Sequence, residues 1–143
     1  MREALAAAAE GGAVGDVPVG AVVIHDGAVL VRASNRTVRD QDPTAHAELL
    51  AIREASRLLG RWRLDDCTLV ATLEPCAMCA GAIVLSRLGR LVFGAWDDKA
   101  GMVGSLGDIV RHPRLNHRPE VLAGVLSEEC GAVLAGFFRE RRS

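Results

Sequence analysis

The chain has 143 residues, of which 50% are hydrophobic and 24% charged, with a formal net charge of -1 at pH 7. This length and apolar content exclude a disordered chain and predict a single domain over residues 1–143 with its own core. No apolar run approaches the ~18 residues of a membrane span, and residues 1–10 do not match an export signal, so we expect a cytoplasmic protein without a membrane partner.

The first half of the chain predicts a helix, a hairpin and a second helix. Residues 1–10 are rich in alanine and predict the first helix, which we expect to end at the glycines that begin with Gly11. Residues 17–35 form two β-branched runs around an Asp-Gly turn, the pattern of a β-hairpin. After a polar loop, Thr44 is the expected N-cap of a helix that stops at Gly60.

The second half of the chain predicts three more strands and two more helices. We expect, in order, a strand at 67–74, a helix at 76–89, a strand at 90–96, an edge strand at 120–126 and a closing helix capped at Ser127. Residues 97–119 are rich in glycine and predict loops around one short helix at "SLGDIV". Strands that alternate with helices after a hairpin predict a five-stranded mixed sheet in a three-layer α/β/α fold.

Two cysteines lie three residues apart at the start of a predicted helix, in "LEPCAMCAGA". At this spacing Cys76 and Cys79 can face one metal ion, and the helix N-terminus lowers the pKa of their thiols. The same spacing is found in thioredoxin-like redox pairs and in helices with two small buried side chains. The pattern alone leaves all three interpretations open.

The stretch "TAHAELLAI" favours the metal site among these three interpretations. His46 starts a helix and adds one nitrogen to two sulfurs, the donor set of a catalytic zinc that keeps its fourth position open. Such a zinc lowers the pKa of a bound water, and Glu48 is the carboxylate that can move its proton to a substrate. Redox exchange uses neither His46 nor Glu48, so a hydrolytic zinc site accounts best for these residues.

The zinc residues carry a resemblance to a known family. His46-Ala47-Glu48 followed by Pro75-Cys76-x-x-Cys79 is the H-x-E…P-C-x-x-C pattern of zinc nucleobase deaminases. Over nearly its whole length the chain resembles the bacterial tRNA-specific adenosine deaminases, in "VPVGAVV", "DPTAHAE", "ATLEPCAMCAGAI", "SRLGRLVFGA", "GSLGDIVRHPRLNH" and "FFRERR". The zinc pattern is shared by all cytidine deaminase-like enzymes, whereas the last two stretches indicate the tRNA branch.

This resemblance implies a cytidine deaminase-like fold, a homodimer and conversion of the wobble adenosine, position 34, of an arginine tRNA to inosine. It implies one zinc per chain, held by His46, Cys76 and Cys79, with Glu48 as the proton shuttle. It also implies that Asn35 hydrogen-bonds the flipped base, that the backbone of Ala47 lies against the base and that Val19 walls the pocket. By its spacing alone, Asn35 is a turn residue after a strand.

The tRNA anticodon loop is the expected partner, because a base in a loop is easily unstacked. We expect Lys99 and Arg139 to contact phosphates and Phe138 to contact the RNA. Asp97 can accept a hydrogen bond from a ribose hydroxyl, which distinguishes RNA from DNA. The alternatives are an ordinary solvated face for the basic residues and a loop-capping role for Asp97.

Other functions fit part of the pattern. The same zinc residues serve deaminases of free guanine, cytosine or cytidine, although the arginine-rich carboxyl end favours tRNA. An engineered variant that acts on single-stranded DNA would carry the same motifs. A catalytically silent RNA-binding subunit with structural zinc is the non-enzyme alternative, and it gives no reason for Glu48.

Overall fold

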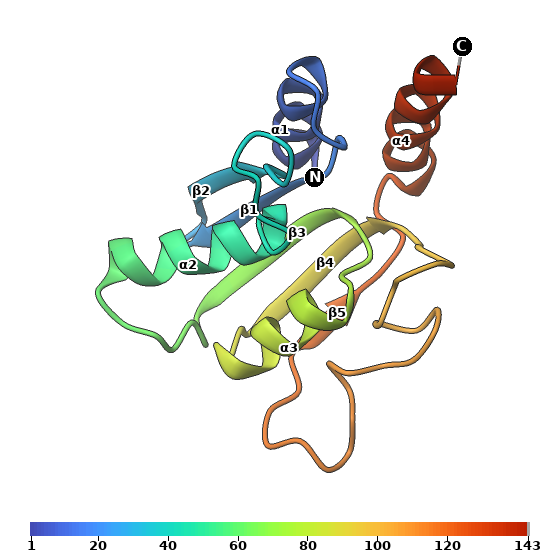
Figure 1. Ribbon diagram of the computed structural model, residues 1–143. Coiled ribbons are helices and arrows are strands. Elements are labelled where there is room, and N and C mark those ends of the chain that lie inside the picture. Colours follow the sequence, from blue (N-terminus) through green and yellow to red (C-terminus); the bar gives the residue numbers. More distant parts are fainter. Residues whose placement is uncertain (143) are drawn as a thin grey trace.

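The computed structural model describes residues 1–142, which are built around a five-stranded sheet in the order β2-β1-β3-β4-β5 (Figure 1). The strands are β1 (Gly20–His25), β2 (Ala28–Ser34), β3 (Cys67–Leu73), β4 (Arg90–Ala95) and β5 (Glu120–Leu122). Strand β1 is antiparallel to β2 and β3, whereas β3, β4 and β5 run parallel. The predicted mixed sheet is confirmed.

Helices cover both faces of the sheet. On one face α1 (Arg2–Ala13) packs on β1 and β2, and α4 (Ser127–Arg142) packs on β4 (Figure 1). On the other face α2 (Ala47–Leu59) packs on β2 and β1 and lies beside α3 (Ala77–Leu85). This is the predicted three-layer arrangement. None of the helices within residues 1–142 combines the length and the apolar character that a bilayer crossing requires.

The alternation of side chains in β1 explains how one strand serves both layers. Ala21 and Val23 are fully buried in the main core, which also contains Ala51 of α2. Val22 points the other way and packs with Ala4 of α1. Successive side chains of a strand point to opposite faces, so an almost wholly apolar strand is what a sheet covered on both sides needs.

The end of α1 and the start of α2 differ from those predicted. Helix α1 continues through Gly11 to Ala13, because it lies so close to β2 that a Cβ at Gly11 would stand 3.0 Å from the Ser34 side chain. Glycine therefore allows this packing rather than ending the helix. Helix α2 begins at Ala47 instead of directly after Thr44, because the Thr44 amide and hydroxyl both donate to the Asp42 carboxylate in a separate turn.

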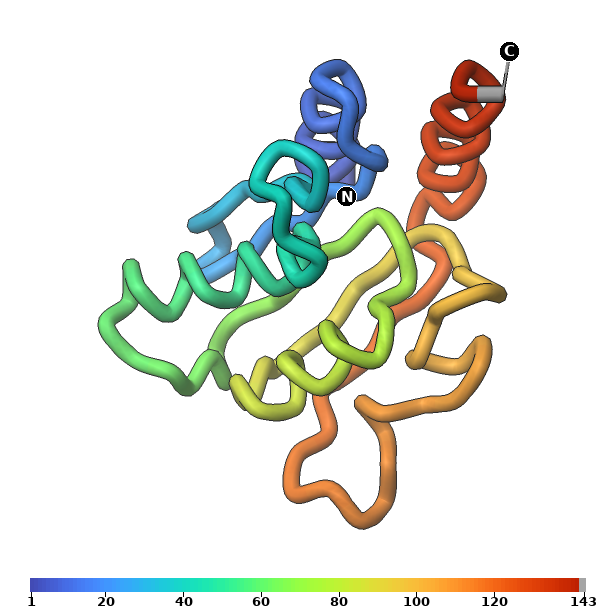
Figure 2. The backbone as a smooth tube through the Cα atoms, viewed as in Figure 1, coloured from blue at the N-terminus to red at the C-terminus, as the bar shows by residue number. Residues whose placement is uncertain are grey.

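The later elements are shorter than predicted. Helix α3 ends at Leu85 rather than near Gly89, since Arg87 adopts a left-handed backbone with φ of 57°. Strand β5 ends at Leu122 rather than at residue 126. The short helix predicted in segment 97–119 is wrong: the described backbone forms turns with a β-bridge between Val103 and Asp108. Figure 2 shows this segment as a long excursion between β4 and β5.

Candidate active site

The predicted site residues converge on one edge of the sheet. His46 is the N-cap of α2 and Cys76 is the N-cap of α3, directly beyond the carboxyl end of β3. Asp97 follows the carboxyl end of β4, which is parallel to β3. Because β1 is antiparallel to β3, Val19 before β1 and Asn35 after β2 reach the same edge. The carboxyl ends of parallel strands are where α/β proteins place their sites.

Three donor atoms from these elements lie together. The Nδ1 of His46 is 3.5 Å from the Sγ of Cys76 and 3.7 Å from the Sγ of Cys79. Zinc–nitrogen and zinc–sulfur bonds of about 2.0–2.3 Å in a tetrahedron separate such donors by roughly 3.6 Å. Among residues 1–142, this is the group of three donors positioned to hold a metal ion. Nitrogen and two sulfurs suit zinc in both chemistry and spacing.

The charge state of the donors prepares the site for a cation. Hydrogen bonds from Cys79 and from His46 lower the pKa of Cys76 to about 3. The bond to Cys76 raises the pKa of His46, and the same thiol pair together with burial raises the pKa of Cys79. These shifts favour a thiolate at Cys76, and a bound cation displaces the protons held by the other donors, as metal binding to thiols requires.

Glu48 lies in the first turn of α2, beside these donors. Its side chain is buried, with the residue 4% exposed, and burial raises the pKa of Glu48 to about 7. Its Oε1 has no hydrogen-bond partner among residues 1–142. A buried carboxyl oxygen without a partner costs free energy, so Glu48 is held at this position at the expense of stability. Such residues are typical of catalytic sites.

A cavity of about 280 Å³ joins the donors to the other predicted residues. Val19, Asn35, Ala47, Glu48 and Asp97 all line it, together with His46 and Cys76. Its walls also include Val17 and Leu73, which the sequence analysis did not single out. The volume lies at the lower end of ligand sites, which suits one nucleobase. The Oδ1 of Asn35 is buried there and has no partner among residues 1–142.

Glu74 is a site residue that sequence reasoning missed. It is 1% exposed, and one carboxylate oxygen accepts the amides of Val103 and Ser105 at 2.9 and 3.0 Å. The other accepts the amide of Asp97 at 2.9 Å and the Ser105 hydroxyl at 2.5 Å. Glu74, which lies two residues before Cys76, thus fixes loop 97–105 over the cavity. The feature of the sequence that could have indicated a role for Glu74 is its place as an acidic residue directly after a buried apolar strand.

A second cavity adjoins the first and holds most of the residues predicted to contact RNA. It measures about 460 Å³, and Val17, Leu73 and Asp97 line both cavities. Lys99 and Phe138 line the second cavity, as does Trp96, which is 50% exposed. Arg139 lies on α4 and lines neither cavity. The Oδ1 of Asp97 accepts the amides of Lys99 and Ala100, the loop-capping arrangement.

A larger cavity lies away from the donor atoms. It measures about 490 Å³ between α1, β2 and α2. Its basic residues are Arg32, Arg36 and Arg39, and each pairs with an acidic side chain. Positive charge that is already neutralised gives no reason to bind an anion here. His46, Cys76 and Glu48 line the cavity of about 280 Å³ instead.

Comparison with known proteins gives consistent likenesses. Residues 1–95 match the sequence model of the cytidine and deoxycytidylate deaminase zinc-binding region. The chain is similar to a tRNA-specific adenosine deaminase of Bacillus subtilis (strain 168), at 50% identity over 99% of this chain and 88% of the relative. A solved structure from a study of A-to-I editing by tRNA:A34 deaminases at the wobble position of transfer RNA has a TM-score of 0.90 and 43% identity, covering 94% and 97% of the chains. A guanine deaminase from Nitrosomonas europaea is less similar, with a TM-score of 0.77, 28% identity and coverage of 94% and 80%.

Proposed function

We propose a function for this chain from its family: it belongs to the zinc-dependent cytidine and deoxycytidylate deaminases and, among these, to the tRNA-specific adenosine deaminases. The proposed function is the deamination of adenosine to inosine at the wobble position of a tRNA. An arginine tRNA is the expected substrate. The observation that carries the proposal is the buried Glu48 carboxyl in the same small cavity as His46 and Cys76. A structural metal site has no use for a buried acid with an unpartnered oxygen.

The proposed reaction is a hydrolysis: water oxygen bonds to C6 of adenine, the C6–N bond breaks, and inosine and ammonia leave. Zinc held by His46, Cys76 and Cys79 supplies Lewis-acid activation of the attacking water. Glu48 takes one proton from this water and donates it to N1 of the base. Glu48 then carries a second proton to the departing amine, so the carboxyl ends in its starting state.

Residues around the cavity position the base for this proton transfer. We assign the Asn35 Oδ1 to accept a hydrogen bond from the base, because a buried amide oxygen without a partner has this capacity unused. The Ala47 backbone lies against the base, and Val19 is one of its apolar walls. These walls exclude bulk water and so strengthen the polar contacts inside.

Neighbouring nucleotides of the anticodon loop are assigned to the second cavity. Phe138 offers a partly exposed ring for stacking, and Lys99 and Arg139 offer charge for phosphates. One Asp97 oxygen already accepts two amides. A ribose hydroxyl would therefore bind the other Asp97 oxygen, with the first contact keeping the carboxylate oriented.

We also propose that the protein forms a homodimer through α2 and α3. Trp62 and Leu85 are 60% and 71% exposed on this side of the molecule. A cavity of about 500 Å³ between the two helices is lined by Trp62 and Leu85. Exposed apolar patches of this kind mark protein interfaces, and the family resemblance makes a second copy the expected occupant. A tRNA substrate supports a cytoplasmic location.

The experiment that tests the function measures inosine at the wobble position of an arginine-tRNA anticodon stem-loop. Parallel reactions contain the matching DNA loop, free adenosine, guanine and cytidine, and protein stripped of metal by a chelator. We expect inosine in the RNA loop alone and no product after chelation. Ammonia from a free base or nucleoside, with no inosine in RNA, would replace the substrate while keeping the zinc chemistry. Comparable product from DNA would indicate a relaxed site.

A further inference from the structure

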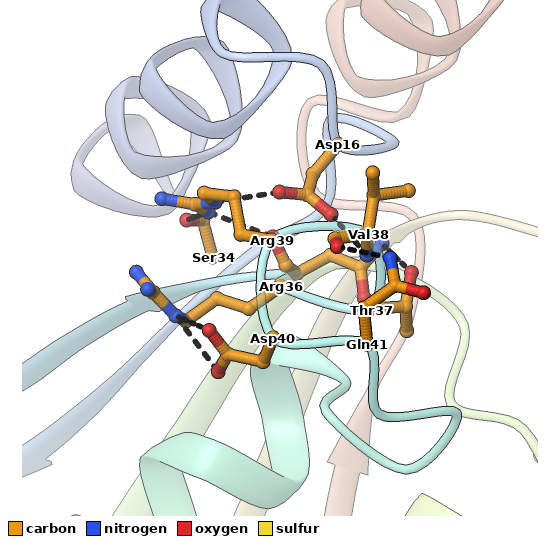
Figure 3. Close-up of polar contacts among 9 residues, drawn as sticks. Asp16, Ser34, Arg36, Thr37, Val38, Arg39, Asp40 and Gln41 are labelled. Carbon is orange, nitrogen blue, oxygen red and sulfur yellow. Dashed lines mark hydrogen bonds and ion pairs between the residues drawn. The ribbon is translucent and has the colours of Figure 1, made fainter.

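Arg39 connects the segment before β1 to the end of β2. Its Nε donates to the Oδ2 of Asp16 at 2.5 Å, and its Nη2 donates to the Oγ of Ser34 at 3.0 Å (Figure 3). The same Nη2 donates to the backbone oxygen of Asn35 at 2.9 Å. One planar guanidinium thus holds three acceptors in a fixed arrangement.

Asp16 is the buried anchor of this contact. It is 0% exposed, and its second oxygen, Oδ1, accepts the amide of Val38 at 2.8 Å (Figure 3). The Asp16 carboxylate therefore binds the loop after β2 at two points, the backbone amide of Val38 and the side chain of Arg39. A buried carboxylate paired in this way is costly to leave with one partner missing. The next residue, Val17, lines the cavity.

Asn35 is held at its backbone and open at its side chain. Its amide donates to the oxygen of Val19 at 3.0 Å, and its own oxygen accepts from Arg39. Its Nδ2 donates weakly to the Thr37 hydroxyl at 3.4 Å, whereas Oδ1 is buried in the cavity without a partner among residues 1–142. The direction of Oδ1 is thus set largely by the backbone contacts.

We infer that the ion pair between the buried Asp16 carboxylate and the partly exposed Arg39 side chain is a positioning device that aims Asn35 at the substrate base. The inference rests on the proposed function, because it assumes that Asn35 Oδ1 binds the adenine. Arg39 itself does not line the cavity that contains Glu48. It acts through the backbone of Asn35, in the way that supporting hydrogen bonds orient residues of other sites.

The same loop contains a matched control. Arg36 pairs with Asp40, four residues on, at 3.0–3.1 Å, and both side chains are more than one-third exposed (Figure 3). This pair is local, and within residues 1–142 its side chains bond to no other segment. Arg36→Gln and Arg39→Gln remove the same charge from the same loop, but only the second removes the link to Asn35.

The test is a double-mutant cycle on kcat/KM with the anticodon stem-loop, using Arg39→Gln, Asn35→Ala and both together. We expect Arg39→Gln to lower kcat/KM about tenfold, the size of coupling seen between residues in contact. Adding Arg39→Gln to Asn35→Ala should lower it no further, because Arg39 acts through Asn35. Arg36→Gln should stay within about twofold of wild type. Zinc content and Tm are recorded for every variant.

The outcomes separate the positioning role from other causes. If the two losses multiply in the double variant, or if Arg36→Gln loses as much as Arg39→Gln, the positioning role is wrong. If Arg39→Gln fails to fold, Arg39→Lys tests the same role, because lysine keeps the ion pair with Asp16. Arg39→Lys should still lose activity, since an ammonium group cannot hold all three acceptors. Full activity of Arg39→Lys would overturn the positioning role. Wild type without inosine instead overturns the proposed function.

Discussion

At the scale of single residues, Glu48 and Glu54 stand on the same helix in opposite environments. Glu48 is buried in its cavity, whereas the Glu54 side chain is 42% exposed and paired with Arg57. We predict that Glu48→Gln lowers kcat by about 10²-fold or more, the usual share of general acid–base catalysis. Inosine formation is measured beside zinc content, which should stay at one per chain.

The matched variant for this prediction is Glu54→Gln, which removes an exposed carboxylate from α2. It should keep wild-type kcat, because its partner Arg57 lies outside the cavity. An active, zinc-loaded Glu48→Gln protein would contradict the proton-shuttle role.

Asp16 makes a prediction about stability and pH. Burial disfavours its charged form, but hydrogen bonds from Val38 and Arg39 outweigh burial and hold the pKa of Asp16 below its usual range. Arg36 also faces this carboxylate at longer range. A folded-state pKa below the unfolded value of about 3.9 adds stability above that pH, and this stability is lost as pH falls through the folded-state pKa.

We therefore predict that Asp16→Asn lowers the free energy of unfolding by roughly 1–3 kcal/mol at pH 7. The gap between wild type and variant should shrink as pH falls below about 4. Urea unfolding at pH 7 and at several values below 4 measures both quantities. A gap that is equally large at every pH would show that Asp16 contributes by packing rather than by charge.

The residues of the zinc site were predictable because each lies within a short sequence motif. Cys76 and Cys79 are three residues apart, so helix geometry brings them to one side. His46 and Glu48 are two residues apart where the extended N-cap residue His46 leads into the first turn of α2. The partners of Glu74 lie 23 to 31 residues later in the chain. No local pattern predicts such a contact, and the same holds for Asp16 and Arg39, which are 23 residues apart.

At the scale of elements, α1 and β1 touch at Gly20. A Cβ at this position would stand 2.0 Å from the backbone oxygen of Ala4 and 2.7 Å from the amide nitrogen of Ala8. We predict that Gly20→Ala forces α1 away from the sheet and costs about 3 kcal/mol, the upper range for overpacking. Urea unfolding measures the loss.

The control is Gly131→Ala in α4, where a Cβ would meet nothing within 4 Å among the residues that the structure describes. Alanine there should stabilise the protein by roughly 0.5–1 kcal/mol, the helix preference over glycine. If both substitutions destabilise equally, glycine at 20 has no special packing role.

Close packing between elements explains which element boundaries were predictable from the sequence. Hydrophobic periodicity predicted the order of strands and helices, but glycines were interpreted as helix ends. At Gly11 the tertiary approach of β2 decides instead, and the helix passes through. In segment 97–119 the apolar stretch suggested a helix. Val103 and Val110 are 0% exposed there because the loop itself packs into the core, so apolar residues did not indicate regular structure.

At the scale of the whole molecule, the outer side of α2 and α3 is the surface through which we propose dimerisation. We predict that Leu85→Glu converts the dimer to a monomer, because a charge at a buried interface is left unpaired. Sedimentation or size-exclusion chromatography with mass detection measures the change. Leu122→Glu is the control, since Leu122 is 55% exposed on edge strand β5. A wild-type protein that is monomeric at high concentration would disprove the proposed interface.

The Glu74 residue belongs to the turn that leads to Cys76, and its carboxylate also holds loop 97–105 in place. This shared anchor limits how the substrate range of the protein can evolve. Gly101 is pressed against the Glu74 side chain, where a Cβ would stand 2.3 Å from it, and Ser105 donates to it. Change at either position disturbs the metal site as well as the loop. Asp98 and Lys99 are exposed on the same loop. Both residues also line the second cavity, so selection can alter the contacts to RNA through these two side chains while the Glu74 anchor keeps the chemistry in place.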